Sequence, residues 1–351
     1  MDDAWLRSGS AHDLGQLVGH MEQLAGVRLV EAADGPARGS RIVQVWTGSG
    51  LVFDVLAERA LDIHACHFRG VPLAWVSPLS VVHPAYYEPE GAAWLRTYGG
   101  GLFVTGGLDH FGAPTEYPDG QVGLHGRSAN LPTQSLGYRA YWEKQVYVLE
   151  VTGQVRQARL FGENLVMERR ISTALGASRI RIEDVVTNQG SVAQRHLFVY
   201  HFNIGYPMVS ETSRLCADVR ETVPHDAAAT AAVPGWSRFQ EPMAGFREQN
   251  FWHVPVPDSE GRVQVVLESP LTGLALRWTY DATWLPYLLE WKMMGQGAYV
   301  VGIEPCNCTG MGSPLSPDDP ADLPHLAPGE SRRYSVDVEV LELGGGAEAA
   351  T

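Results

Sequence analysis

A period-two alternation of apolar and polar residues is the feature that most limits how this sequence can fold. From residue 334 to 340 the run YSVDVEV places an apolar side chain at every second position. Successive side chains of a strand point to opposite faces, so this run predicts a strand with one buried face. The pattern recurs in 179–190, and the segments 41–63 and 262–281 each have the pattern of two strands joined by a turn. The chain is therefore expected to consist mainly of β-strands.

Turn signals separate these strands at short intervals. Residues 48–50 divide the segment 41–63, and 118–120 (PDG) and 258–261 (DSEG) mark two further turns. Proline fixes φ and glycine accepts a positive φ, which gives these turns a physical basis. The 38 glycines and 22 prolines of the chain suit many short strands joined in this way.

One segment, residues 11–27, departs from the period of two. Its apolar residues follow one face of a helix, and they are Leu14, Leu17, Val18, Met21 and Leu24. Ser10 is a suitable N-cap for this helix. A single helix among many strands predicts an all-β sandwich or barrel, and about 330 ordered residues predict two extended sheets in one large domain.

The expected domain organisation has three parts. Residues 1–30 form an N-terminal helical extension, 31–343 form the β-sandwich domain, and 344–351 form a disordered tail. Within the sandwich domain, 309–329 are rich in proline and are expected to form a loop.

The charge balance of the chain disfavours a polyanionic partner. The sequence has 26 Lys and Arg against 40 Asp and Glu, a net charge of −14, whereas phosphate backbones attract basic faces. No stretch approaches the ~18 uninterrupted apolar residues of a membrane span, and the first residues lack the pattern of a signal peptide. We therefore expect no nucleic-acid partner, no membrane association, a cytoplasmic location, and a monomer or homodimer.

The cysteines and one pair of histidines do not predict a metal site. Cys306 and Cys308 lack the two-residue gap of zinc or redox motifs, and four cysteines are too few for a disulfide framework. Free thiols are expected instead. His64 and His67 are three residues apart, which on a strand directs them to opposite faces. No metal and no cofactor is expected.

Polar groups gather in a few short segments where a plain strand would not need them. These segments are 106–112 (GGLDHFG), 123–132 (GLHGRSANLP), 200–207 (YHFNIGYP), 290–297 (EWKMMGQG) and 298–307 (AYVVGIEPCN). Glu304 follows an apolar, strand-like run and precedes a proline, and His201 has a similar position in its own segment. Only a large folded sheet could bring these two distant residues together.

A carboxylate and an imidazole are the two groups that opening a sugar ring requires. One removes the proton of the anomeric hydroxyl, the other protonates the ring oxygen, and each contributes ~10²–10⁴-fold within hydrogen-bond reach. A neighbouring carboxylate is expected to raise the pKa of the imidazole and to keep it protonated near neutral pH. The alternatives are a core histidine with satisfied hydrogen bonds and a carboxylate that accepts backbone N–H groups.

With these motifs in the order Leu124-His125-Gly126, His201 and Glu304-Pro305, the chain resembles a known family from about residue 40 to 343. It is similar to the aldose 1-epimerase (galactose mutarotase-like) superfamily, and most closely to its divergent bacterial, DUF4432-type branch. The resemblance implies a β supersandwich fold. It also implies that His201 is the acid, Glu304 the base, and His125 a substrate-binding residue that helps to stabilise the ring oxygen. An arginine of the family corresponds to Arg59 or Arg96.

Several further residues are candidates for binding the substrate. Together with His125 they are Arg127, Asp109, Asn203, Arg59, Lys292 and Trp291. Polar groups on loops often serve ligands, and an indole can stack on the apolar face of a pyranose. Asp109 could instead cap its own turn, and Trp291 could be a core residue with Lys292 extended along the surface.

The sequence therefore predicts a carbohydrate-active isomerase. Its reaction would be cofactor-independent mutarotation of an unidentified aldose or sugar derivative by general acid and base catalysis. One alternative is a carbohydrate-binding or regulatory protein that has lost turnover, because a fold alone does not define an activity. Another is a lyase or other sugar chemistry on the same scaffold, although a glycosidase needs a second carboxylate, for which Asp109 is the candidate.

Overall fold

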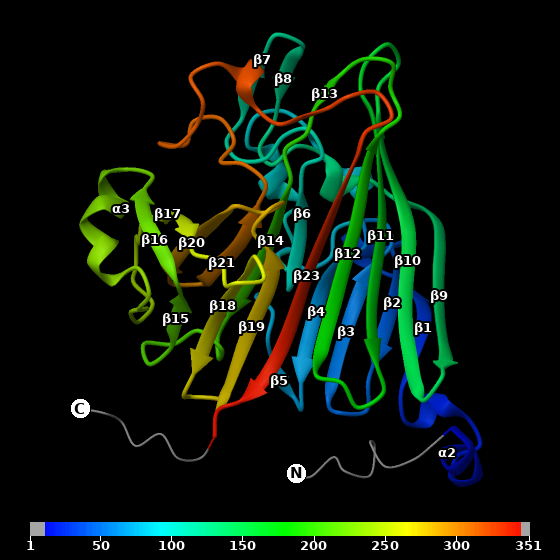
Figure 1. The fold of residues 1–351 in the computed structure, drawn as a ribbon. Helices are drawn as coiled ribbons and strands as arrows, with labels where there is room; N and C mark the ends of the chain where they lie inside the picture. Colours follow the sequence, from blue (N-terminus) through cyan, green and yellow to red (C-terminus); the bar gives the residue numbers. More distant parts are fainter. Residues whose placement is uncertain (1–10, 345–351) are drawn as a thin grey trace.

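Two large antiparallel sheets face each other in the computed structural model, which describes residues 11–344 (Figure 1). The 11-stranded sheet has the order β1 (Gly26–Glu31), β2 (Arg41–Trp46), β3 (Leu51–Leu56), β4 (Asp62–Phe68), β6 (Phe103–Gly106), β14 (Val199–Gly205), β21 (Ala298–Cys306), β20 (Tyr287–Gly295), β17 (Gln249–Pro255) and β16 (Val219–Pro224), with β5 (Val71–Pro72) paired to β4. The 8-stranded sheet has the order β15 (Arg214–Ala217), β18 (Arg262–Ser269), β19 (Leu274–Asp281), β23 (Ser331–Glu342), β12 (Arg179–Asn188), β11 (Asn164–Ala174), β10 (Val146–Ala158) and β9 (Thr133–Glu143). The predicted all-β sandwich is confirmed.

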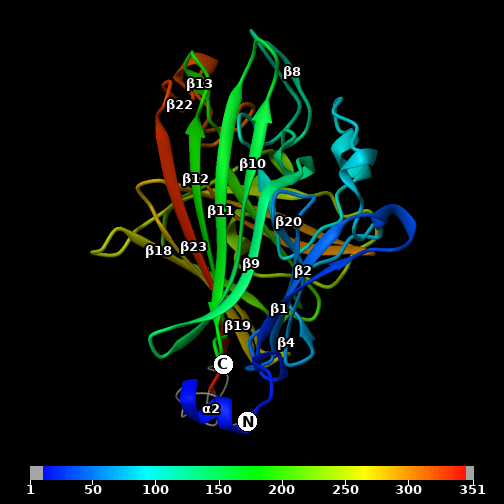
Figure 2. The same cartoon turned by 90° about the vertical axis from the view of Figure 1, so that its right-hand side faces the viewer.

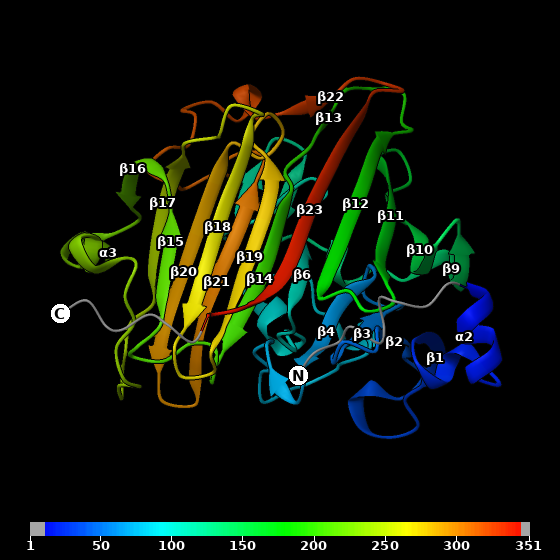
Figure 3. The ribbon, with the colours of Figure 1, turned by 60° about the horizontal axis from the view of Figure 1, so that its bottom comes forward.

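Short elements complete the fold around the two sheets. Two small sheets pair β7 (Thr115–Tyr117) with β8 (Gly120–Val122) and β13 (Gln194–Arg195) with β22 (His325–Leu326). The helices are α2 (Ala11–Leu17) and α3 (Ala227–Ala232), and the 3₁₀ turns are η1 (Met21–Gln23), η2 (Gly35–Ala37), η3 (Pro84–Tyr86), η4 (Ala93–Arg96), η5 (Ser128–Asn130), η6 (Val233–Gly235) and η7 (Pro320–Asp322). Figure 2 shows α2 at the bottom of the sandwich, and Figure 3 shows α3 beside β16 and β17.

The inner faces of the two sheets form the main hydrophobic core. Phe202 of β14 and Ile303 of β21 belong to it, as do Trp278 of β19 and Val336 and Val338 of β23. The last strand has the predicted alternation, since every second residue from 334 to 340 is buried. Because strand side chains alternate between faces, the neighbours of Phe202 and Ile303 point away from this core.

A buried arginine ties the two sheets together. Arg169 of β11 is fully buried and binds both carboxylate oxygens of Asp184, each at 2.8 Å. Its Nη1 reaches across to the other sheet and donates to the Thr105 hydroxyl at 2.7 Å and to the Ala60 carbonyl at 2.9 Å. The network satisfies a charge that would otherwise be costly to bury, and it joins β11 and β12 of one sheet to β6 of the other.

The predicted short N-terminal helix is present, but it ends earlier than expected. The expected helix over 11–27 covers only α2 and the turn η1, and Gly15 and Gly19 within it lower its helix propensity. A second helix, α3, begins after Asp226, whose side chain accepts from the Ala229 N–H. Ser10 and residues 345–351 of the expected tail lie outside the described residues. β1 begins at Gly26 and pairs with β2, so the large sheet starts before residue 31.

Candidate active site

His201 and Glu304 meet on neighbouring strands of the 11-stranded sheet. The register of β14 and β21 pairs Phe202 with Ile303, which sets His201 beside Glu304. His201 Nε2 lies 3.3 Å from Glu304 Oε1. Both side chains point away from the main core, because Phe202 and Ile303 point into it. The structure therefore brings together the two residues that the sequence singled out.

Burial decides the protonation of this pair. The two side chains retain only 7% and 1% of their exposure. Burial lowers the pKa of His201 to about 4, and burial together with the charge of Glu248 raises the pKa of Glu304 well above its usual range. At neutral pH the imidazole of His201 is then neutral, and the shift of the Glu304 pKa favours its protonated carboxyl. The expectation that the carboxylate keeps His201 protonated is wrong, because desolvation outweighs the attraction.

The pair has unused hydrogen-bonding capacity. Among the described residues, His201 Nδ1 and both carboxyl oxygens of Glu304 have no hydrogen-bond partner, and the 3.3 Å contact is not aligned as a hydrogen bond. Gly302 makes room for this arrangement, since a Cβ there would lie 2.4 Å from Glu304 Oε1. Buried polar groups are nearly always paired, so three unpaired atoms in one place indicate a position for a ligand.

Aromatic rings surround the imidazole of His201. Its ring centroid lies 5.7 Å from that of Trp291, 5.4 Å from that of His125 and 5.9 Å from that of Tyr98. Trp291 is half-buried, and its Nε1 donates to the exposed Glu248 at 2.8 Å. A half-buried indole beside a carboxyl group is a suitable platform for a sugar ring.

Three aromatic residues of this wall were not predicted from the sequence. Trp94 stacks on Tyr98 with ring centroids 4.4 Å apart, and Trp75 lies 6.0 Å from Tyr98 and 6.4 Å from Trp291. All three come from the long connection between β4 and β6. The density of aromatic residues in 75–98 was the available signal, but a loop has no periodicity that tells which surface it covers. Glu248 was missed for the same reason.

Asn203 lies next to the pair, and its amide group is bonded within the protein. It is fully buried, its Oδ1 accepts from the Tyr98 hydroxyl, and its Nδ2 donates to the carbonyls of Gly101 at 3.1 Å and His201 at 2.9 Å. These contacts favour a structural role over substrate binding. Asn203 instead holds Tyr98 and the backbone of His201 in position.

Lys292 lies on the opposite face of β20 from Trp291. Its Nζ donates to three backbone carbonyls, those of Gly235, Trp236 at 2.8 Å and Arg238 at 2.6 Å. Burial lowers its pKa. The prediction that Lys292 binds substrate is therefore contradicted, since the strand alternation directs it away from the pair and it anchors the segment 235–238.

Arg59 and Arg96 are the two candidates for the arginine that the resemblance implies, and they differ in exposure. Arg59 is buried, and its Nη1 donates to Asn130 Oδ1 at 2.9 Å and to the Val82 carbonyl at 3.2 Å. It thereby fixes the turn η5 and has a structural role here. Arg96 is exposed, and its Nε lies 3.8 Å from a Glu88 oxygen.

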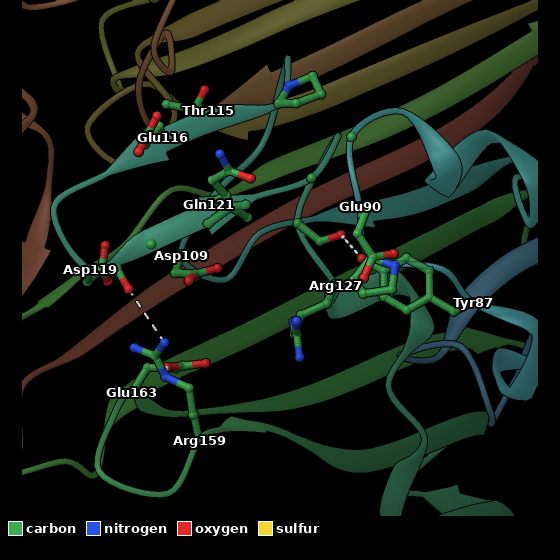
Figure 4. Close-up of a pocket in the computed structure, with 17 residues that line it drawn as sticks. Tyr87, Glu90, Asp109, Thr115, Glu116, Asp119, Gln121, Arg127, Arg159 and Glu163 are labelled. Atoms are coloured by element: carbon green, nitrogen blue, oxygen red, sulfur yellow. Dashed lines mark hydrogen bonds and ion pairs between the residues drawn. The ribbon is translucent and has the colours of Figure 1, made fainter.

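The loop from Gly123 to Arg127 separates two places in the molecule. His125, which has a φ of 56°, packs its ring against His201 and lies 4.8 Å from Trp94. Burial lowers the pKa of His125 well below its usual range. Arg127 instead lines a cavity of about 540 Å³ together with Asp109 (Figure 4). His125, Trp291, His201 and Glu304 thus form one group, and Arg127 and Asp109 form another.

Three of the remaining expectations concern metals, thiols and membranes. Within residues 11–344, no group of three or more His, Cys, Asp or Glu side chains is arranged to hold a metal ion. The four cysteines are free, as predicted. In the same part of the chain, no helix has both the length and the apolar character needed to span a membrane.

The fold is a two-sheet β-sandwich, and the larger sheet carries the pair His201 and Glu304. Residues 37–340 match the model of a family described as a domain of unknown function (DUF4432), so the chain belongs to that family. Among curated proteins, no sequence matches the chain.

Several solved structures have a similar fold. A protein of Klebsiella pneumoniae, provisionally named an aldose 1-epimerase, has a TM-score of 0.84 and 22% identity, over 92% of this chain and 86% of that one. A galactose mutarotase-like protein of Clostridium acetobutylicum has a TM-score of 0.63 and 11% identity, over 90% of this chain and 99% of that one. Galactose 1-epimerase of Lactobacillus acidophilus has a TM-score of 0.58 and 13% identity, over 91% of this chain and 99% of that one. At these identities the likeness shows a shared fold, and this is the fold that the resemblance implied.

Proposed function

We propose that this protein interconverts the anomers of an aldose or a closely related sugar, without a cofactor. The observation that carries the proposal is the contact of 3.3 Å between His201 Nε2 and Glu304 Oε1, in a site where three of their polar atoms have no partner. Opening a pyranose requires two groups that exchange protons with the sugar. Here His201 and Glu304 lie side by side, and the indole of Trp291 is next to them.

The proposed reaction breaks the bond between the anomeric carbon and the ring oxygen. The neutral imidazole of His201 accepts the proton of the anomeric hydroxyl, and the carboxyl of Glu304 donates its proton to the ring oxygen. The electron pair of the broken bond stays on the ring oxygen, and the anomeric carbon becomes an aldehyde. Rotation about the neighbouring carbon–carbon bond, followed by return of both protons, closes the ring as the other anomer.

The protonation of the resting pair supports this assignment of roles. Burial leaves His201 neutral and Glu304 protonated, so the imidazole is the base and the carboxyl the acid in ring opening. These roles are the reverse of those that the resemblance implies. The open-chain state leaves an imidazolium beside a carboxylate, and in a buried site these opposite charges stabilise one another.

The remaining residues of the proposed site hold the sugar. Trp291 supplies a platform for one face of the ring, and Glu248 at its indole N–H marks the exposed side from which a sugar approaches. His125 borders His201 and lies close enough to contact the same substrate. A bound pyranose would also exclude water from the pair, which strengthens the electrostatic interactions within it.

Magnetisation-transfer NMR on equilibrating aldoses tests the proposal. The wild-type protein is expected to exchange the α and β anomeric signals of at least one sugar in a broad panel faster than buffer does. Glu304→Gln keeps the size of the side chain but removes its acid, and it should lower the exchange rate by about 10²–10⁴-fold. If no sugar in the panel exchanges faster than in buffer, the proposed activity is wrong.

A further inference from the structure

The cavity beyond the loop 123–127 has the size of a ligand site. Its volume of about 540 Å³ lies within the range typical of small-molecule pockets. The hairpin β7–β8, the turn between β10 and β11, the segment 87–91 and the chain at 126–127 form its walls (Figure 4). Its lining residues come from parts of the chain far apart in sequence.

Part of the polar lining is already engaged in contacts within the protein. Arg159 Nε lies 3.1 Å from a carboxylate oxygen of Glu163. Asp109 accepts a hydrogen bond of 2.6 Å from Gln157, and an oxygen of Asp119 lies 3.4 Å from Arg195 Nη1. These contacts hold the walls in place.

Another part of the lining consists of exposed polar side chains. Among the described residues, four such side chains make no hydrogen bond or ion pair within the protein, and they are Arg127, Gln121, Glu90 and Glu116. Figure 4 shows the Arg127 guanidinium extending into the space between Tyr87 and Arg159. Planar donors and acceptors of this kind, next to the ring of Tyr87, match a ligand with many hydroxyl groups and an apolar face.

The charge of the lining selects against an anionic ligand. Two guanidinium groups, of Arg127 and Arg159, face five carboxylates of Glu90, Asp109, Glu116, Asp119 and Glu163. Arg159 is already neutralised by Glu163. A phosphate or uronate group would therefore meet a net negative wall, and like charges disfavour binding.

We propose that this cavity is a second carbohydrate site, which binds a neutral saccharide independently of any turnover at His201 and Glu304. The two sites share the loop 123–127, whose His125 ring contacts His201 while Arg127 faces the cavity. Tyr87 connects them further, because its hydroxyl donates to the Gly126 carbonyl at 3.0 Å. A saccharide in the cavity would contact the loop that carries His125.

Saturation-transfer-difference NMR and calorimetry with neutral mono- and disaccharides test the proposal. The cavity variant is the double substitution Gln121→Ala and Arg127→Ala, and Trp291→Ala removes the platform at the pair. Arg220→Ala, an exposed arginine of β16 outside the cavity, is the matched control. We expect a neutral saccharide whose Kd rises roughly tenfold or more in the cavity variant and is unchanged in the other two, which corresponds to about 1.4 kcal/mol.

Three results would overturn the proposal. The first is binding that survives in the cavity variant but disappears in Trp291→Ala, which assigns all binding to the pair. The second is tighter binding of sugar phosphates or uronates than of their neutral counterparts, with loss in the cavity variant. The third is no binding of any neutral saccharide by a wild-type protein whose Tm matches that of the variants. Absence of anomer exchange at the pair would leave this test unaffected.

Discussion

The 11-stranded sheet carries two histidine–glutamate contacts of the same length in different surroundings. His253 Nε2 lies 3.3 Å from Glu290 Oε2, as His201 Nε2 does from Glu304 Oε1. The second pair joins the neighbouring strands β17 and β20, and it shares a face with Leu288 of the main core. Both of its side chains are fully buried.

The difference lies in how the hydrogen bonds are used. His253 Nδ1 bonds to the Thr222 hydroxyl at 2.9 Å, and its Nε2 bonds to Glu290. Within residues 11–344, Glu290 Oε1 is the one side-chain atom of that pair that lacks a partner, whereas three atoms of His201 and Glu304 lack one. The ring of Trp236 covers His253 with centroids 4.6 Å apart. Proximity of an acid and an imidazole is therefore a weak indicator of catalysis, and unused bonding capacity next to an accessible platform is a stronger one.

Exchanging each glutamate for glutamine provides the strongest test of this contrast. Glu304→Gln should reduce anomer exchange by about 10²–10⁴-fold with little change in Tm, because its carboxyl oxygens have no partner to lose. Glu290→Gln should leave exchange near the wild-type rate, because Glu290 lies on the other face of the sheet. Exchange rates and thermal melts of both variants provide the measurement. Equal loss of activity in the two variants would remove the distinction between the pairs.

A substitution at Thr222 tests whether the second pair is structural. Thr222→Val keeps the shape of the side chain but leaves His253 Nδ1 without its partner in a buried position. We expect the free energy of unfolding to fall by about 1–3 kcal/mol. Chemical denaturation measures this value, with anomer exchange as the control that should stay unchanged after correction for the folded fraction. No loss of stability would show that the hydrogen bond contributes little.

The pH dependence of turnover sharpens the role of the first pair. The pKa of His201 is lowered to about 4 by burial, so its imidazole stays an active base down to that pH. Because burial raises the pKa of Glu304 well above its usual range, its carboxyl keeps its proton to a higher pH than an ordinary glutamate does. On the acid side, the exchange rate should therefore fall about tenfold per unit below pH 4 and level off above it. A decline with a midpoint near 6.5 on the acid side would show an ordinary, solvated histidine.

The two pairs also show what could be predicted from the sequence. Alternation and turn residues are local signals, and they correctly predicted the strands. The expectation that Glu304 ends its strand was wrong, because β21 continues through Pro305 to Cys306. His253 and Glu290 are unremarkable in sequence, and their contact arises from the register of β17 and β20. Pairing between distant strands is not encoded in any short window.

The errors on β20 have a simpler physical cause. Trp291 and Lys292 were predicted to bind the same substrate, yet neighbouring residues of a strand point to opposite faces. The period of two that predicted the fold therefore allowed only one of them to face the pair. Lys292 faces the other way, where carbonyls of the segment 235–238 accept its hydrogen bonds. That segment is distant in sequence, so the choice between Trp291 and Lys292 could not be made from β20 alone. The aromatic residues of 75–98 could not be assigned to the site from the sequence for a related reason, because a loop has no such period.

The smallest expected effect concerns how Tyr98 supports the first pair. Its hydroxyl donates to Asn203 Oδ1, and Asn203 in turn bonds to the His201 carbonyl at 2.9 Å. Tyr98→Phe removes one hydrogen bond and keeps the ring beside His201, so we expect kcat to fall by roughly 2- to 10-fold, from about 0.5–1.5 kcal/mol. KM should change less, because the ring that borders the site is retained. A larger effect on KM than on kcat would mean that the hydroxyl contacts the sugar itself, and would move Tyr98 from a positioning role to a binding one.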